Sequence, residues 1–250
     1  MRYFSLRVVI GIVLVALSAL VYLLHYVLFR DAHHIFIYLV GDIAFDFIEV
    51  LLVTLIIDQL LHEREKQSLL FKLNMIIGIF FSEAGTEILR LLSSFDTQVD
   101  RIRGDFLVTD RWSKQDFLAL RKRVNAYEHK MDSRQADMGH LKDFLLGKRD
   151  FMLRILENPN LLEHEGFTDA LWATLHLAEE FAGRKSLENL PKADHGHLAH
   201  DMSRAYSRLI SEWLNYMWHL RQHYPYLFSL AMRTNPFDLN ASVEVREEVA

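Results

Sequence analysis

Three carboxylic acids interrupt an apolar run from Ile35 to Ile57, and this run constrains the fold more than any other feature of the chain. At about 23 residues, the run is long enough to cross the roughly 30 Å hydrocarbon core of a bilayer as a helix. Asp42, Asp46 and Glu49 stand at i, i+4 and i+7, so a helix places them on one face. A charged acid at mid-bilayer costs about 2.5–3.5 kcal/mol, so we expect these acids to be paired, protonated or close to the headgroups.

A preceding apolar run, between Val8 and Phe29, carries polar residues at the same spacing. An antiparallel hairpin folded about the link Arg30–His34 would align the two polar stripes. The expected pairs are His25 with Asp42, Tyr22 with Asp46, and Ser18 with Glu49. We interpret this polar seam as hydrogen bonding that fixes the register of two membrane spans. The alternative is a proton or cation path, which requires an oligomer because two helices cannot enclose a pore.

The first run also has to be distinguished from a cleaved signal peptide, because its flank is positive and Ala16-Leu17-Ser18 resembles a cleavage site. Its apolar residues continue to Phe29, which is too long for a cleaved segment and favours an uncleaved span. Lys and Arg residues flank the outer ends of the two runs, whereas the link contains Arg30 alone. The sequence therefore predicts a multi-pass membrane protein with both termini in the cytoplasm.

Composition excludes several classes of protein. The net charge of −5 disfavours nucleic-acid binding, which needs a basic face. Cysteine is absent, which excludes disulfides, thiol catalysis and Cys-ligated zinc. No Gly-rich phosphate loop, H-E-x-x-H or G-x-S-x-G motif occurs, and we expect no bound cofactor.

The predicted fold class is all-α, a two-helix transmembrane hairpin followed by a cytoplasmic helical bundle, because no segment alternates at period two. The expected divisions are a hairpin at 1–62 with spans at 8–29 and 35–57, a juxtamembrane amphipathic helix at 63–94, a bundle at 95–233 and a polar tail at 234–250.

Four longer helices and a short aromatic helix at Tyr226–Met232 are predicted in the bundle. Ser113 and Asp116 form a capping box for a helix that ends near Lys130, and a second helix runs from about 136 to 157 before Pro159. Thr168 is the expected N-cap of a third helix. The longest runs from about 194 to 224, and its apolar residues at a spacing of three and four predict a buried stripe.

Histidines and acids gather on the third and fourth helices. The candidate metal ligands are His176, Glu179, Glu180, His195, His200 and Asp201. Such groups can bind zinc or a di-metal centre. Their spacing does not match the Glu-x-x-His pairs of di-iron bundles. His200-Asp201 resembles the dipeptide of helical metal-dependent phosphohydrolases. His197 and His200 point away from the buried stripe of the longest helix and are expected to be solvated. Solvated histidines and helix capping are therefore favoured over a metal site.

Two segments resemble uncharacterised bacterial inner-membrane proteins of a similar plan, namely GDIAFDFIEVLLVTLIIDQLLHERE at 41–65 and EWLNYMWHLRQHYPYLFSLAMRTNPF at 212–237. The resemblance implies a membrane location and no activity. We therefore expect a non-enzymatic, membrane-anchored scaffold or sensor that contacts the lipid bilayer and a protein partner or further copies of itself. The alternatives are an oligomeric proton or cation conductor that uses Asp42, Asp46 and Glu49, and a helical metal-dependent hydrolase.

Overall fold

The computed structural model describes residues 2–127 and 129–245. Within them every regular element is a helix, which confirms the predicted all-α class, and one isolated bridge pairs Asp96 with Met131. The chain divides into two compact units, Met1–Lys66 and Gln67–Ala250, and each is described by itself.

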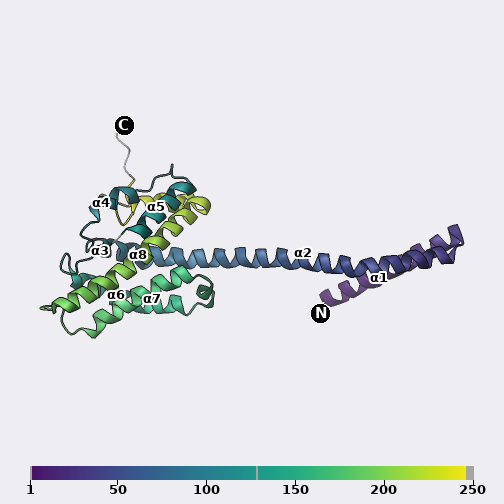
Figure 1. Cartoon of the computed structure of the whole chain (residues 1–250), viewed down its shortest axis with the longest axis horizontal. Coiled ribbons are helices and arrows are strands. Elements are labelled where there is room, and N and C mark those ends of the chain that lie inside the picture. Colours follow the sequence, from purple (N-terminus) through teal and green to yellow (C-terminus); the bar gives the residue numbers. More distant parts are fainter. Residues whose placement is uncertain (1, 128, 246–250) are drawn as a thin grey trace. The chain divides into compact units, whose positions relative to one another are not determined.

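The first unit holds helix α1 (Arg2–Phe29) and the beginning of helix α2 (Ala32–Phe80) (Figure 1). The link is shorter than predicted, because α2 begins at Ala32 rather than after His34. Arg30 takes a positive φ of 47°, and Asp31 accepts a hydrogen bond from the backbone N–H of His34 at 3.1 Å. An aspartate that caps a first turn in this way starts a helix early.

Val8–Phe29 is long and apolar enough to cross a membrane, with a mean hydropathy of 2.6, and no other helix in the described residues meets that criterion. The second run, Ile35–Ile57, carries three acids and does not meet the criterion, so a two-span hairpin is not confirmed. Both runs nevertheless expose large apolar side chains throughout.

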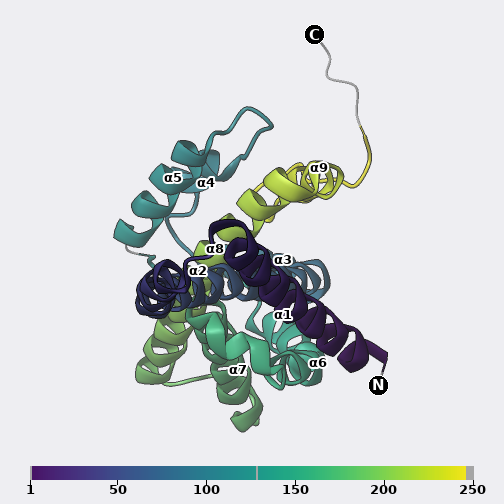
Figure 2. The ribbon, with the colours of Figure 1, turned by 90° about the vertical axis from the view of Figure 1, so that its right-hand side faces the viewer.

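The structure does not bring the polar seam together. Among the described residues, no hydrogen bond or ion pair joins Ser18, Tyr22 or His25 to the three acids of α2. Instead the His25 ring stacks on His34, with centroids 5.9 Å apart. Figure 2 shows why: α1 leaves the turn and diverges from α2 toward its N-terminus. The seam stays a prediction.

The second unit is a bundle built around one long helix. Its elements after α2 are the π-helical turn η1 (Phe81–Gly85), α3 (Thr86–Ser93), α4 (Asp100–Arg103), the 3₁₀ turn η2 (Gly104–Phe106), α5 (Lys114–Ala126), α6 (Met138–Leu156), the 3₁₀ turn η3 (Pro159–Glu163), α7 (Glu165–Gly183), α8 (Lys192–His223) and α9 (Pro225–Arg233). Helix α8 packs against α3, α5, α7 and α9, and α6 lies against α7 (Figures 1 and 2).

The buried stripe predicted on the longest helix is confirmed. Seven residues of α8 at the expected spacing are buried, namely Leu198, Met202, Ala205, Leu209, Trp213, Tyr216 and Leu220. The last turns of α2 add Leu73, Ile77 and Phe80 to the same core. Apolar burial at this periodicity, rather than helix propensity, stabilises the bundle.

Several predicted boundaries are wrong for local reasons. Helix α5 ends at Ala126 because Tyr127 is extended, with φ −83° and ψ 126°, and the carbonyl of Lys130 beyond it accepts hydrogen bonds from Thr97. Helix α7 is capped by His164, whose Nδ1 accepts from the N–H of Phe167 at 3.1 Å, and Thr168 lies inside the helix. The capping box of Ser113 and Asp116 is confirmed.

The polar tail was predicted to begin at residue 234, but the first residues of this segment are packed into the bundle. Asn235 and Phe237 are buried, and the Phe237 ring stacks on Phe106 with centroids 4.1 Å apart. The Asn235 side chain donates to the carbonyl of Phe106 at 2.7 Å and accepts from the N–H of Phe237. A short polar segment is therefore part of the core, and residues 246–250 of the predicted tail lie outside the described residues.

Candidate metal centre

The same short pattern occurs once on α7 and once on α8. His176 and Glu180 stand four residues apart on α7, and His197 and Asp201 stand four residues apart on α8. Residues at i and i+4 share a helix face. Because α7 and α8 pack against each other, the two pairs meet between them.

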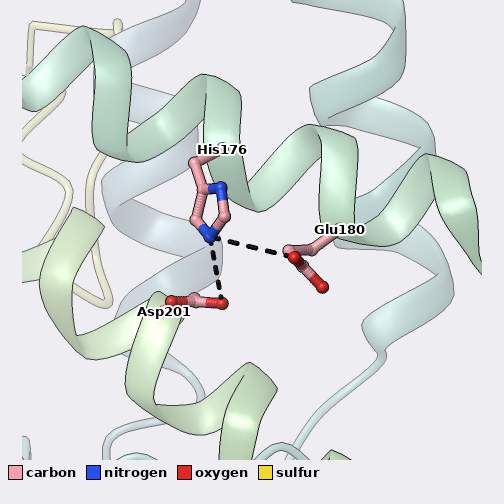
Figure 3. Close-up of side chains that lie close together, drawn as sticks. All are labelled: His176, Glu180 and Asp201. Carbon is pink, nitrogen blue, oxygen red and sulfur yellow. Dashed lines mark ion pairs between the residues drawn. The ribbon is translucent and has the colours of Figure 1, made fainter.

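Figure 3 shows His176 and Glu180 on one helix and Asp201 on the other, with one ring nitrogen of His176 pointing toward both acids. The Nε2 atom of His176 is 3.5 Å from Oδ2 of Asp201 and 3.9 Å from Oε1 of Glu180. One ligand atom from each of these three residues lies within 4.8 Å of the other two.

His197 contacts the same two acids from α8. Its Nε2 atom is 3.3 Å from Oδ2 of Asp201 and 3.4 Å from Oε2 of Glu180. Ligand atoms about 2.0–2.1 Å from a tetrahedral zinc ion lie about 3.3 Å from one another. The contacts of His197 with the two acids are close to this separation, and the residues whose ligand atoms all lie within 4.8 Å of one another are His176, Glu180 and Asp201.

Asp201 is the most buried residue of the cluster. Its side chain is 1% exposed, and among the residues that the structure describes neither of its oxygens has a hydrogen-bond donor. Arg204 approaches Oδ1 at 3.3 Å as an ion pair. A buried carboxylate without hydrogen bonds is costly unless a cation compensates its charge.

Arg184 holds the two helices in position beside this cluster. Its guanidinium donates to both oxygens of Asp194, at 2.6 and 2.9 Å, and to Oε2 of Glu180 at 2.8 Å. The hydrogen bonds of Arg184 hold the pKa of Glu180 and the pKa of Asp194 below their usual values. Glu180 is thus kept ionised and oriented, as outer contacts orient a metal ligand.

The six metal candidates of the sequence separate into two groups. The structure brings His176, Glu180 and Asp201 together. The other three point elsewhere: Glu179 pairs with Arg149 on α6 at 3.7 Å, His195 lies 2.7 Å from the hydroxyl of Ser133, and His200 lines a separate groove. His200 lines that groove whereas Asp201 lies in the cluster, so the structure does not bring the two residues of the His-Asp dipeptide to one site.

Sequence reasoning missed His197, which it assigned to solvent. The signal was present, because His-x-x-x-Glu at 176–180 and His-x-x-x-Asp at 197–201 are the same pattern on two helices that a short connection joins. The side chain of His197 is 51% exposed, as expected for a solvated residue, and it also contacts the two acids.

A second polar cluster lies between α8 and the segment after α5. Nδ1 of His129 is 3.5 Å from Oδ2 of Asp96, and both side chains are almost fully buried. The rings of Tyr127 and Tyr206 pack edge-on against His129 at 4.9 Å. Burial, followed by the charge of Asp96, raises the pKa of Tyr127 to about 12 and also raises the pKa of Tyr206. The sequence gives no periodic signal for Asp96 or His129, because both lie in irregular segments.

The raised pKa of Tyr127 predicts a loss of stability at high pH. The folded state holds the phenol proton more tightly than the unfolded state, so this contribution is complete below about pH 10 and is lost toward about pH 12. Tyr127→Phe should therefore flatten the fall in the free energy of unfolding between about pH 10 and about pH 12. Urea denaturation measures it, with the exposed Tyr226→Phe as control. Equal slopes in all three proteins would contradict the prediction.

Comparisons with known proteins match both units of the chain. Residues 69–233 match a family model described as "Uncharacterized protein MJ1433, C-terminal helical domain", and residues 2–61 match "MJ1433, N-terminal helical domain". Uncharacterized protein MJ1433 of Methanocaldococcus jannaschii is 43% identical over 240 residues, which cover 96% of each chain. No solved structure matches the chain significantly.

Proposed function

We propose a function from the side chains of this chain, which belongs to the MJ1433 family, because the descriptions of that family name no activity. The protein is a membrane-anchored sensor whose helical bundle binds a divalent transition metal between α7 and α8. The observation that carries the proposal is the buried carboxylate of Asp201, which lies among two histidines and Glu180.

The apolar surface of the first unit supports membrane anchoring. The side chains of Val8–Phe29 are exposed almost throughout, with Val15 at 71% and Leu28 at 67%. Soluble monomers rarely expose contiguous apolar patches larger than a few hundred Å². A lipid bilayer would cover such a surface, and within the bilayer further copies of the chain would cover it too. The multi-pass topology, the bacterial inner membrane and the cytoplasmic termini belong to the same proposal.

The donor set supports a transition metal over magnesium or calcium. Two imidazole nitrogens and two carboxylates suit zinc and its neighbours, whereas magnesium and calcium prefer oxygen ligands alone. The site joins two helices, and an ion there would tie α7 to α8. Metal binding would therefore change the stability of the bundle. A sensor needs such a change, which a partner that contacts the bundle would detect.

A zinc titration of the full chain in mild detergent tests the proposal. We expect one zinc ion per chain and a thermal unfolding midpoint that rises with zinc and falls back on addition of a chelator. The chain should also remain in the membrane pellet after alkaline extraction. The absence of saturable zinc binding would refute the metal sensor, and release into the supernatant would refute the anchor.

A metal-dependent hydrolase is the second candidate, and one observation favours it. His176 is 44% exposed, so an ion held by these residues would keep a side open to water, as catalytic zinc sites do. Hydrolysis of a simple phosphate ester by the zinc-loaded chain, lost in Asp201→Asn, would favour this candidate over the sensor. Zinc binding without hydrolysis would favour the sensor.

A further inference from the structure

An acid on α8, Glu212, is buried in the bundle and has no part in the metal centre. Its side chain is 7% exposed. Its Oε1 atom accepts a hydrogen bond from Nδ2 of Asn215 at 3.4 Å, and among the described residues Oε2 has no hydrogen-bond partner. A buried carboxylate with so few hydrogen bonds is costly, and binding a proton removes its charge.

The first turn of α7 lies directly against this carboxyl group. A Cβ at Gly166 would lie 2.5 Å from Oε1 of Glu212, so glycine leaves the room that the carboxyl group occupies. Gly166 is the second residue of α7. The first turn of a helix presents backbone N–H groups that have no partner inside the helix. A change of charge on Glu212 therefore acts on the point where α7 begins.

His164, the N-cap of α7, faces Glu212. Its Nδ1 atom accepts from the N–H of Phe167 at 3.1 Å, so Nδ1 holds no proton and the neutral ring carries its proton on Nε2. That Nε2 atom is 3.9 Å from Oε2 of Glu212, which is beyond hydrogen-bond distance. The imidazole therefore lies beside the carboxyl group without satisfying it.

One further charge near Glu212 comes from α5. Arg121 donates from Nη1 to Oδ1 of Asn215 at 3.1 Å, so it acts on Glu212 across a neutral amide. Among the described residues, α3 and α9 place no charged side chain in ion-pair contact with Glu212. Burial raises the pKa of Glu212, and the charges of His164 and Arg121 and the hydrogen bond from Asn215 offset only part of that rise.

We propose that Glu212 is a proton switch at the start of α7. The protonated carboxyl group is neutral and fits the space beside Gly166. When the proton leaves, a buried negative charge remains with Oε2 unpaired, and the first turn of α7 loosens from α8. His176 and Glu180 lie further along α7, so acidity acts on the helix that carries two residues of the metal cluster, by a route that does not use the metal.

The direction of the switch follows from linkage. A carboxyl group whose pKa is raised on folding holds its proton more tightly in the folded state. Its contribution to stability is therefore complete below the unfolded pKa, about 4.5, and is lost as the pH rises through the folded pKa. Acid closes the start of α7 against Glu212, and alkali opens it.

Urea denaturation of the full, chelator-treated chain in detergent tests the proposal, with Glu212→Gln as the variant. Glutamine keeps the shape of the side chain and stays neutral at every pH. The ratio of the unfolding equilibrium constants, native over variant, should rise by about tenfold between about pH 4.5 and about pH 8. Glu165→Gln removes an exposed acid from the same turn of α7, and its ratio should change by less than about twofold.

Amide hydrogen exchange on the same samples locates the effect. As the pH rises, the amides in the first two turns of α7 should lose protection relative to those of α6 in the native chain, once the exchange rates are corrected for the intrinsic effect of pH. The loss should be smaller in Glu212→Gln. An equal loss in both proteins would mean that another group loosens α7.

Each other outcome of the denaturation experiment also overturns the proposal. A ratio that is constant with pH means that Glu212 does not change its charge in the folded chain. A ratio that falls as the pH rises means that the ionised carboxylate stabilises the start of α7 as an anion at a helix N-terminus. Failure of Glu212→Gln to fold means that a neutral side chain of this shape does not fit. Because metal is absent throughout, failure of the metal centre leaves these results unchanged.

Discussion

Gly85→Ala is expected to lower the free energy of unfolding of the bundle by about 2–3 kcal/mol, because an added methyl group overpacks a closed part of the core. A Cβ at Gly85 would lie 2.5 Å from Cε1 of Phe80 and 2.7 Å from Cδ1 of Phe81. Both rings are 0% exposed, so neither can swing into solvent. The turn is π-helical, with the N–H and the hydroxyl of Thr86 both donating to the carbonyl of Phe81, and this widened turn brings Gly85 against the rings.

Gly147→Ala is the matched control for this prediction. Gly147 lies inside α6 and is exposed, and no described atom outside its own helix backbone would lie within 4 Å of an added Cβ. Alanine there should raise the free energy of unfolding by about 0.5–1 kcal/mol, because it lowers the backbone entropy lost on folding. Urea denaturation of both variants measures the pair. A neutral or stabilising Gly85→Ala would show that the π-turn is not packed as described.

Asp201→Asn is expected to weaken zinc binding by about 100-fold or more, since loss of a ligand exceeds the 10–100-fold effect of losing an outer contact. Asparagine keeps the shape of the side chain and removes its buried negative charge. The ion-pair partner of Asp201, Arg204, is 41% exposed and stays solvated, so without metal the variant should be at least as stable as the native chain. Competition with a fluorescent zinc chelator measures the affinity, and thermal unfolding in chelator measures the stability.

His200→Gln distinguishes this result from a general effect of changing α8. His200 is the neighbour of Asp201 in sequence but faces the separate groove, so its loss should leave zinc affinity within about twofold. If His200→Gln weakens zinc binding as much as Asp201→Asn, surface histidines bind the metal and the site between α7 and α8 is wrong.

The elements of the bundle follow from the sequence where burial is periodic. The α8 stripe from Leu198 to Leu220, the capping box at Ser113 and the stop at Pro159 are each local signals, and each is confirmed. The buried Phe237 was not predictable in this way. Its partner Phe106 is more than a hundred residues away, and a single apolar residue in a polar segment has no period.

The metal cluster was half predictable for a similar reason. His176, Glu180 and Asp201 were selected by residue type, but grouping them requires the rotation of α7 against α8, which depends on packing. His197 was assigned to solvent because it lies outside the α8 stripe. A metal ligand at the edge of a helix interface also lies outside that stripe, so the pattern cannot distinguish the two. The pairing of His25 with Asp42 remains a prediction, because register alone does not bring two helices together.

X-ray absorption at the zinc edge of the full chain, purified without an affinity tag and loaded with one equivalent of zinc, tests the central claim most directly. The structure predicts a first shell of nitrogen and oxygen atoms at about 2.0–2.1 Å, with the outer-shell scattering of two imidazole rings. In Asp201→Asn this signature should be lost. A shell of oxygen atoms alone, or a spectrum that Asp201→Asn leaves unchanged, would contradict a metal centre between α7 and α8.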